Sequence, residues 1–246
     1  NCNFCAVRPS RAQVCLLRAF LLLLRVRKAA ATRGMTIETT MTKNILFDLG
    51  NVLLKFDWDI AYKRLATHLN PLTALLLWAR KDEFLAEIRG DQEMLETGRM
   101  TSQQFFSRLK GKIGLEIDYS LFEDIWCNIF TLNQDVMDFA RALGKTYSCY
   151  ILSNTNEVHM RHVSSQYDLG FFKGIAVSHE LGALKPAREF YDRALAKLAL
   201  DAAECIFIDD MAANVEAARA AGIESVRFES AAQLRDELGT RGIVPA

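Results

Sequence analysis

Short apolar stretches alternate with amphipathic helical patterns through the second half of the chain. The apolar stretches predict strands at residues 147–154, 174–180, 204–210 and 224–229, and helical patterns occupy 135–144, 186–200 and 212–222. Parallel strands need crossover connections, which are usually helices, so this alternation predicts an α/β fold with a Rossmann-like parallel sheet covered by helices on both faces. Pro186 is expected in the first turn of its helix, and Gly144 and Gly222 at helix ends.

The first strand of this sheet, within NILFDLGNVLL (44–54), is separated from the others by a segment of a different kind. Residues 58–131 give only helical periodicity, at 62–69, 73–88, 101–113 and 120–130, and Thr101 with Gln104 forms a capping box. We therefore expect a Rossmann-like core of residues 41–57 and 132–246, with a helical cap at 58–131 over the carboxyl end of the first strand. Helices that only pad the sheet are the alternative.

The amino end differs in composition from the rest of the chain. Residues 1–40 hold seven Lys or Arg against one acid, Glu38, and their apolar run is broken by Arg18 and Arg25. That run is too short and too interrupted to span a bilayer. Because Met35 and Met41 stand just before the first strand, we expect a disordered upstream extension from a start site placed too early; a targeting leader is the alternative.

Charge and cysteine use narrow the class of partner. The chain has 30 basic and 30 acidic residues, and 23 basic against 29 acidic remain after residue 40. This mild acidity argues against a nucleic-acid partner. Cys127, Cys149 and Cys205 lie in apolar stretches, as expected of buried thiols in a reducing compartment. We expect a cytoplasmic monomer or homodimer with no membrane partner.

Polar residues end three of the predicted strands. Asp48 ends the first strand, Ser153 the second, and Asp209 with Asp210 the fourth. A single carboxylate at a strand end can be a structural turn acceptor, but the carboxyl ends of parallel strands share one edge, so these side chains should converge. Acids brought together this way need a counter-charge, and an all-oxygen ligand set favours Mg²⁺.

Lys185, in the sequence GALKP before a predicted helix, adds a cation to this group. Alone it reads as a solvated loop residue. Next to a magnesium–carboxylate cluster and a serine hydroxyl it would complete an oxyanion site suited to phosphate, so the substrate class expected is a small phosphorylated metabolite.

The motifs FDLGNVL (47–53), LSNTN (152–156), LKP (184–186) and IDDMAANVEAARAAG (208–222) resemble, in order, the four motifs of the haloacid dehalogenase superfamily with a small helical cap. The resemblance covers residues 41–230. It implies that Asp48 is both the nucleophile, forming an aspartyl-phosphate, and a metal ligand. It also implies phosphate binding by Ser153 and the Asn154 amide, with Lys185 neutralising the phosphate and orienting the nucleophile.

The resemblance further implies that Asp209 and Asp210 complete a Mg²⁺ site to which the backbone carbonyl of Gly50 contributes. Gly50 and Asn51 would also lie beside the substrate. Asn214, one turn into the last motif's helix, either braces the acidic loop or caps the helix.

Gly50 departs from the pattern of the superfamily's phosphatases, which usually carry a second Asp two residues after the nucleophile. That Asp protonates the leaving alcohol, and positioned proton transfer is worth about 10² to 10⁴ in rate. A slow phosphatase is one consequence, and restriction to acidic leaving groups such as an anomeric sugar hydroxyl is another. The FDLGNV form resembles bacterial sugar-phosphatases acting on glucose 1-phosphate. Asn51, Asp57 or a cap side chain are candidate replacements for the missing acid.

The expected function is Mg²⁺-dependent hydrolysis of small phosphomonoesters. Because Gly50 replaces the second Asp, the activities of a haloacid dehalogenase and of a phosphonate hydrolase are alternatives. The pair Asp209 and Asp210 favours Mg²⁺, which dehalogenases do not use. A phospho-accepting receiver domain carries similar residues, but its acid pair comes first in the chain and it has no helical insert. A catalytically weak binding or scaffold protein is the remaining alternative.

Overall fold

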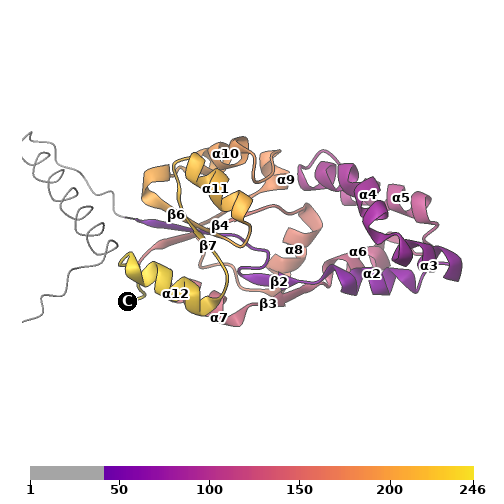
Figure 1. Ribbon diagram of the computed structural model, residues 1–246, viewed down its shortest axis with the longest axis horizontal. Coiled ribbons are helices and arrows are strands. Elements are labelled where there is room, and N and C mark those ends of the chain that lie inside the picture. Colours follow the sequence, from indigo (N-terminus) through magenta and orange to yellow (C-terminus); the bar gives the residue numbers. More distant parts are fainter. Residues whose placement is uncertain (1–41) are drawn as a thin grey trace, which may run out of the picture. The chain divides into compact units, whose positions relative to one another are not determined.

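The computed structural model of the protein describes residues 42–246, which contain a five-stranded parallel sheet (Figure 1). The strands lie in the order β5-β4-β1-β6-β7. Their bounds are β1 Asn44–Phe47, β4 Ser148–Ser153, β5 Gly174–Val177, β6 Cys205–Asp209 and β7 Glu224–Arg227. The prediction of an α/β parallel-sheet core is confirmed. The extension or leader predicted at residues 1–40 lies outside the described residues.

Successive residues of each strand point to opposite sides of the sheet. Both faces therefore carry apolar side chains, and helices cover both. In β1, Ile45 and Phe47 join one hydrophobic cluster and Leu46 joins another. The first cluster receives residues of α7 (Gln134–Leu143), α8 (Glu157–Gln166) and α12 (Ala231–Thr240). The second receives residues of α9 (Ser178–Leu181), α10 (Arg188–Leu198) and α11 (Ala212–Ala220), and a short 3₁₀ turn, Ala202–Glu204, precedes β6.

The strand order places a topological switch point at the centre of the sheet. From β1 the chain moves outward through β4 to β5, and it then returns to the other side of β1 to form β6 and β7. Open α/β sheets bind ligands at the carboxyl ends of the strands where the winding direction reverses. The carboxyl ends of β1 and β6 are therefore the place to look for a site.

Residues 58–127 form a helical segment with its own hydrophobic cluster, centred on Phe105, Phe122 and Trp126. Its helices are α2 Trp58–Ala66, α3 Pro71–Ala79, α4 Lys81–Glu96, α5 Ser102–Ile113 and α6 Tyr119–Cys127. The capping box of Thr101 and Gln104 is present at the start of α5. The prediction of a single helix across residues 73–88 was wrong. Arg80 leaves helical geometry (φ −122°, ψ 35°) and separates α3 from α4.

A two-stranded antiparallel ribbon joins the helical segment to the sheet-containing part, and it corrects the prediction of helix alone through residue 131. Strand β2, Leu54–Phe56, precedes the segment and pairs with β3, Phe130–Leu132, which follows it (Figure 1). Three-residue strands carry no recognisable alternation, so only the return of the chain beside its own starting point reveals the pairing.

Two boundaries near the carboxyl edge also differ from expectation. The strand predicted at 174–180 stops at Val177, where the chain turns into the short helix α9. Pro186 lies two residues before the first helical residue of α10, Arg188, and not in its first turn. Both differences lie where the chain passes over the strand ends, and local propensity is least decisive in such connections. Among the helices of residues 42–246, none has the length and apolar character needed to cross a membrane.

His159 of α8 connects the helical segment to the sheet-containing part. Its ring is stacked on Trp126 of α6 at 6.2 Å between centroids and lies 5.7 Å from Trp58 of α2. Asn156 Nδ2 donates to Nδ1 at 3.1 Å, so the neutral ring donates from Nε2 to the Trp126 carbonyl oxygen, also at 3.1 Å. Burial lowers the pKa of His159 from 6.5 to about 4.

This buried neutral histidine predicts a loss of stability in mild acid. Between pH 6.5 and about 4 the unfolded chain binds a proton at this position and the folded chain does not, so protonation favours unfolding. We expect the contribution to fall by about 2 kcal/mol between pH 7 and pH 5. Urea unfolding of the wild type and of His159→Gln at both pH values gives the two losses of stability. The loss in the variant should be smaller by about 2 kcal/mol. Equal losses in the two proteins would contradict it.

Candidate active site

The polar residues predicted at the strand ends lie on three adjacent strands. Asp48 follows β1, and its N–H donates to the Ile208 carbonyl oxygen of β6 at 2.9 Å. Ser153 ends β4 and Asp209 ends β6, and both strands pair with β1. All three residues are buried. Buried apolar strands are thus followed at one edge by side chains that need a charged or hydrogen-bonding partner.

Three carboxylates converge at this edge. Asp48, Asp209 and Asp210 each offer an oxygen, and these oxygens lie within 4.8 Å of one another. Asp48 and Asp209 are buried, and Asp210 is half-buried. A set of three carboxylate oxygens suits a hard divalent cation such as Mg²⁺, which binds through one or two carboxylates and keeps several waters. The donor chemistry of these residues therefore fits the predicted metal.

Lys185 lies between two of the acids. Its ammonium is 2.8 Å from Asp48 Oδ1, donates to Asp209 Oδ2 at 2.7 Å, and donates to the Leu152 carbonyl oxygen at 3.2 Å. The side chain is 1% exposed, so it faces the carboxylates and not solvent. Burial acts to lower the pKa of Lys185, but the two carboxylates outweigh it and hold the pKa above the usual value. Burial raises the pKa of Asp48, and Lys185 opposes that rise.

Asn154 fixes the backbone of Lys185. Its Oδ1 accepts from the Lys185 N–H at 2.8 Å, and its Nδ2 donates to the Lys185 carbonyl oxygen at 2.9 Å. The Asn154 side chain is thereby engaged, which leaves its backbone N–H as the group available to a ligand. The Ser153 hydroxyl makes one long contact, 3.4 Å to the Asn154 carbonyl oxygen, so it too is available.

Asn214 braces the acidic loop, which decides between its two predicted roles. Its Nδ2 donates to both oxygens of Asp209 at 3.0 Å, and the Met211 N–H donates to Oδ1 at 2.8 Å. The cap position of α11 is held by Met211, not by Asn214. Asp210 accepts a weaker bond, 3.2 Å, from Nδ2 of Asn51, whose left-handed backbone (φ 56°) lies in the turn after β1.

Comparison with known proteins identifies the family. The model of the haloacid dehalogenase-like hydrolases matches residues 42–222. The chain belongs to the haloacid dehalogenase-like hydrolases. It is 27% identical over 206 residues to a D-ribitol-5-phosphate phosphatase of Bacteroides thetaiotaomicron, covering 80% of this chain and 97% of the relative. It is 30% identical over 197 residues to the sesquiterpene phosphatase astK of Aspergillus oryzae, covering 75% and 88%.

The fold is likewise that of solved members of this family. The crystal structure of a haloacid dehalogenase family enzyme from Bacteroides thetaiotaomicron, in complex with magnesium and inorganic phosphate, superimposes with a TM-score of 0.66. The two chains are 23% identical, and the match covers 76% of this chain and 94% of that one. The predicted family and its hydrolase class are therefore confirmed for this chain.

Phe56 occupies the space beside Gly50, the position at which many phosphatases of the family carry a second Asp. A Cβ atom added to Gly50 would lie 2.9 Å from Cε1 of the Phe56 ring, closer than real Cβ contacts. The ring comes from β2, and its edge approaches Trp58 at the start of α2. Sequence reasoning missed this residue, because only the turn after β1 brings β2 back beside Gly50. The chain thus lacks the acid, and the Phe56 ring crowds the position of that residue's Cβ.

Asp57 has a structural role. Its side chain caps α2 by accepting from the Asp59 N–H at 2.9 Å. This argues against the alternative in which Asp57 replaces the missing acid. Ser178 was also missed: its buried hydroxyl donates to the Thr155 carbonyl oxygen and accepts from the Thr155 N–H, both at 2.9 Å. It fixes the loop that follows Ser153, a role for which the sequence gives no local signal.

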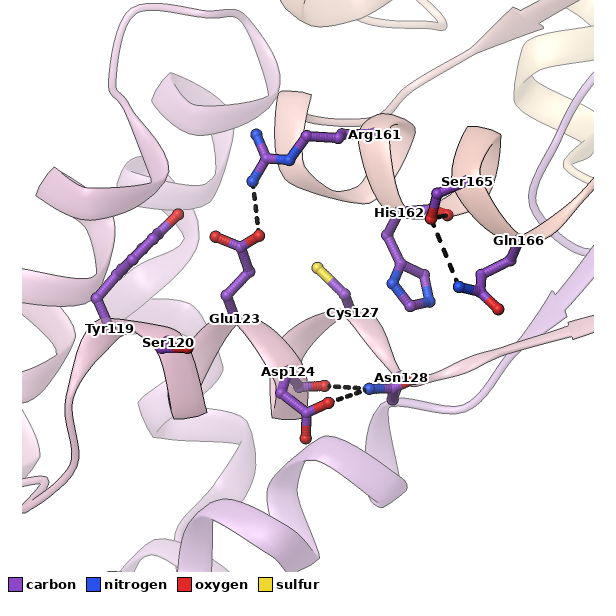
Figure 2. Close-up of a pocket in the computed structure, with 10 residues that line it drawn as sticks. All are labelled: Tyr119, Ser120, Glu123, Asp124, Cys127, Asn128, Arg161, His162, Ser165 and Gln166. Atoms are coloured by element: carbon purple, nitrogen blue, oxygen red, sulfur yellow. Dashed lines mark hydrogen bonds and ion pairs between the residues drawn. The ribbon is translucent and has the colours of Figure 1, made fainter.

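A separate hollow of about 570 Å³ lies between α6 and α8 (Figure 2). Arg161 forms an ion pair with Glu123 across it at 2.6 Å, and Asn128 donates to Asp124 (Figure 2). Burial raises the pKa of Cys127, which also lines it, to about 12, so this thiol stays protonated at neutral pH. None of the strand-end residues lines the hollow, so it is distinct from the carboxylate cluster.

Removal of the central cation should destabilise the protein most when Mg²⁺ is absent. Lys185→Met leaves Asp48 and Asp209 buried without their counter-charge, and we expect a loss of about 3 kcal/mol in the free energy of unfolding in EDTA. Mg²⁺ should stabilise the variant more than the wild type. Urea unfolding with EDTA and with Mg²⁺ measures both effects.

Lys197→Met is the matched control, since Lys197 forms an exposed ion pair with Glu180 that should contribute little. If Lys185→Met were as stable in EDTA as this control, the ammonium would not be holding the acids together.

Proposed function

We propose that the protein is a Mg²⁺-dependent phosphomonoester hydrolase that acts through an aspartyl-phosphate on Asp48. The observation that carries this proposal is the buried ammonium of Lys185, bonded to Asp48 and Asp209 beside a third carboxylate at the switch point of the sheet. Two similar curated proteins named as phosphatases support the same reaction class. The carboxylate cluster favours this reaction over haloacid dehalogenation or a purely binding role.

The hydrogen bonds of Asp48 indicate which of its oxygens attacks. Oδ1 accepts from the Leu49 N–H at 2.7 Å and lies 2.8 Å from the Lys185 ammonium. Oδ2 accepts no hydrogen bond from residues 42–246 and is the oxygen free to approach phosphorus. Attack by Oδ2 forms the aspartyl-phosphate and breaks the bond from phosphorus to the ester oxygen. That oxygen leaves as the alkoxide and takes its proton from solvent, since Gly50 stands where a second Asp would supply one. Water then cleaves the acyl phosphate, releasing phosphate and regenerating the carboxylate.

The remaining residues hold charge in place. When Mg²⁺ is bound by Asp48, Asp209 and Asp210, with the Gly50 carbonyl as a further ligand, its charge offsets that of the carboxylates and of the phosphoryl oxygens. Asp209 takes hydrogen bonds from Lys185, Asn214 and Met211, so it cannot rotate freely. The Ser153 hydroxyl and the Asn154 N–H, held by their loop, are positioned to donate to phosphoryl oxygens.

We further propose that residues 58–131 act as a cap over this edge. The turn after α4 packs against α9: a Cβ atom on Gly98 would lie 2.2 Å from the His179 carbonyl oxygen, and Gly98 has φ 71°. His179 Nδ1 is in turn 3.1 Å from the carbonyl oxygen of Thr155, two residues beyond Ser153. Only glycine fits this approach. Substrate selectivity would then depend on side chains of the cap.

Small sugar phosphates are the substrates we propose, with anomeric esters such as glucose 1-phosphate first. A leaving group that needs little help from an acid suits a site that has Gly50 in place of the usual Asp, with the Phe56 ring against it. The similar D-ribitol-5-phosphate phosphatase supports the broader class of small phosphorylated carbohydrates.

Asp48→Asn tests the proposed nucleophile. We expect Mg²⁺-dependent hydrolysis across a panel of sugar and other small phosphate esters to fall more than about 10³-fold, because the neutral amide cannot attack phosphorus. Phosphate release with Mg²⁺ and with EDTA is the measurement. Asp57→Asn is the matched control and should retain activity, since asparagine also caps helices. Retention of activity in Asp48→Asn would overturn the proposal.

The pair Gly50 and Phe56 predicts how the missing acid can be restored. Gly50→Asp alone should gain little, because the new side chain meets the Phe56 ring. Gly50→Asp with Phe56→Ala should raise kcat for simple alkyl phosphates by about 10-fold to 100-fold and leave p-nitrophenyl phosphate nearly unchanged, since only the poor leaving group needs a proton. Equal gains for both esters would contradict this account of leaving-group dependence.

A further inference from the structure

Helix α3 of the helical segment has no buried residue, although its sequence, PLTALLLWA, is almost wholly apolar. Leu72 is 66% exposed, Leu75 61%, Leu76 51% and Trp78 82%. Isolated exposed leucines are ordinary on protein surfaces, but a run of them on one short helix is not. This surface, made by α3, is called the α3 face below.

The spacing of these residues forms a continuous strip. Leu72, Leu75, Leu76 and Ala79 recur at intervals of three and four, the pattern that places residues on one side of a helix. On the opposite side, Leu77 packs against the hydrophobic cluster of the helical segment, and α3 has its main contacts with α4. The α3 face is therefore directed away from the body of its own segment.

A nine-residue helix cannot be explained by its own stability. Asn70 caps it by accepting from the Thr73 N–H, and Pro71 begins it, but isolated helices shorter than about 12 residues are marginal in water. Helical stability in proteins comes mainly from burial of an apolar side. The exposed strip thus indicates that another surface covers α3.

We propose that the α3 face of a second copy of this chain covers it, in an antiparallel helix pair about a two-fold axis. The proposal is independent of the catalytic function. Three leucines and a tryptophan leave on the order of 500 Å² of apolar area exposed on one copy. Two such faces reach on the order of 1,000 Å², the lower bound for a specific interface. Leu75 is the expected central contact, and Trp78 lies beside it on the flank of the strip that also borders a hollow against α2.

Charge around α3 agrees with this occupant and not with an anionic surface. Arg80 and Lys81 at its carboxyl end are followed by Asp82, Glu83 and Glu87, so the region is not basic as a lipid-binding helix would be.

The two ends of the α3 face complement each other. Glu116 lies at the amino end, where its N–H donates to the His68 carbonyl oxygen at 3.4 Å; it is exposed and forms no ion pair within residues 42–246. Arg80, at the carboxyl end, forms an exposed ion pair with Glu83 of its own chain. An antiparallel pair would bring it toward the partner's Glu116 as a second acidic partner. The opposed helix dipoles add to the attraction.

Sedimentation equilibrium of the full chain over a range of concentrations tests the proposal. We expect a dimer for the wild type, and a dissociation constant at least about 100-fold larger for Leu75→Glu and for Trp78→Ser. Val244→Glu changes another exposed apolar residue, 55% exposed, and should leave the dimer intact. Far-ultraviolet circular dichroism checks that each variant is folded. A monomeric wild type at 100 µM, or dimers unaffected by both substitutions, overturns the proposal.

Charge reversal tests the antiparallel arrangement separately. Arg80→Glu should weaken the dimer, and adding Glu116→Arg should restore it; failure of the rescue overturns that arrangement.

Two further measurements distinguish other occupants of the α3 face. If the full chain is monomeric and a chain starting at Met35 dimerises through Trp78, the face is covered by residues 1–34, and the proposal is wrong. The second measurement is flotation with vesicles of phosphatidylcholine and phosphatidylserine. If the chain does not dimerise but floats with the vesicles, and Trp78→Ser abolishes flotation, a lipid surface covers the α3 face and the proposal is wrong.

Discussion

The buried ammonium of Lys185 is the interaction on which the candidate site depends. Asp48 and Asp209 follow adjacent strands, and both carboxylates are removed from water. Without a counter-charge, desolvation and mutual repulsion would favour their protonation, and a neutral acid is neither a nucleophile nor a metal ligand. One lysine within 2.8 Å of both carboxylates keeps them charged. The site is thus a balance of charge between two buried carboxylates and one buried ammonium.

Several polar side chains serve to hold this balance rather than to touch a ligand. Asn154 fixes the backbone of Lys185, Asn214 fixes the Asp209 carboxylate, and Ser178 fixes the loop after β4. Each is supplied by a loop or by the first turn of a helix at the carboxyl edge of the sheet. A site whose donors are held before the reaction needs little reorganisation when charge develops, which is a main source of catalytic rate.

The helical segment affects the site and the molecular surface in different ways. The β2–β3 ribbon that leads into and out of it brings Phe56 beside Gly50, so an aromatic ring lies against the position at which the acid is absent. The same segment contains α3, and no part of residues 42–246 buries the apolar strip of that helix. The leaving-group preference and the self-association that we propose would thus be separate consequences of one insertion.

The chain's local patterns were sufficient to predict the sheet and its helices, because buried strands and amphipathic helices are encoded in adjacent residues. They were also sufficient to predict that Asp48, Ser153 and Asp209 lie at one edge, because parallel strands end on the same edge of a sheet. They also singled out Lys185. Local patterns could not reveal that Phe56 meets Gly50, that residues 54–56 pair with residues 130–132, or that α3 breaks from α4. Those features depend on contacts between distant residues, and only the folded chain brings such residues together.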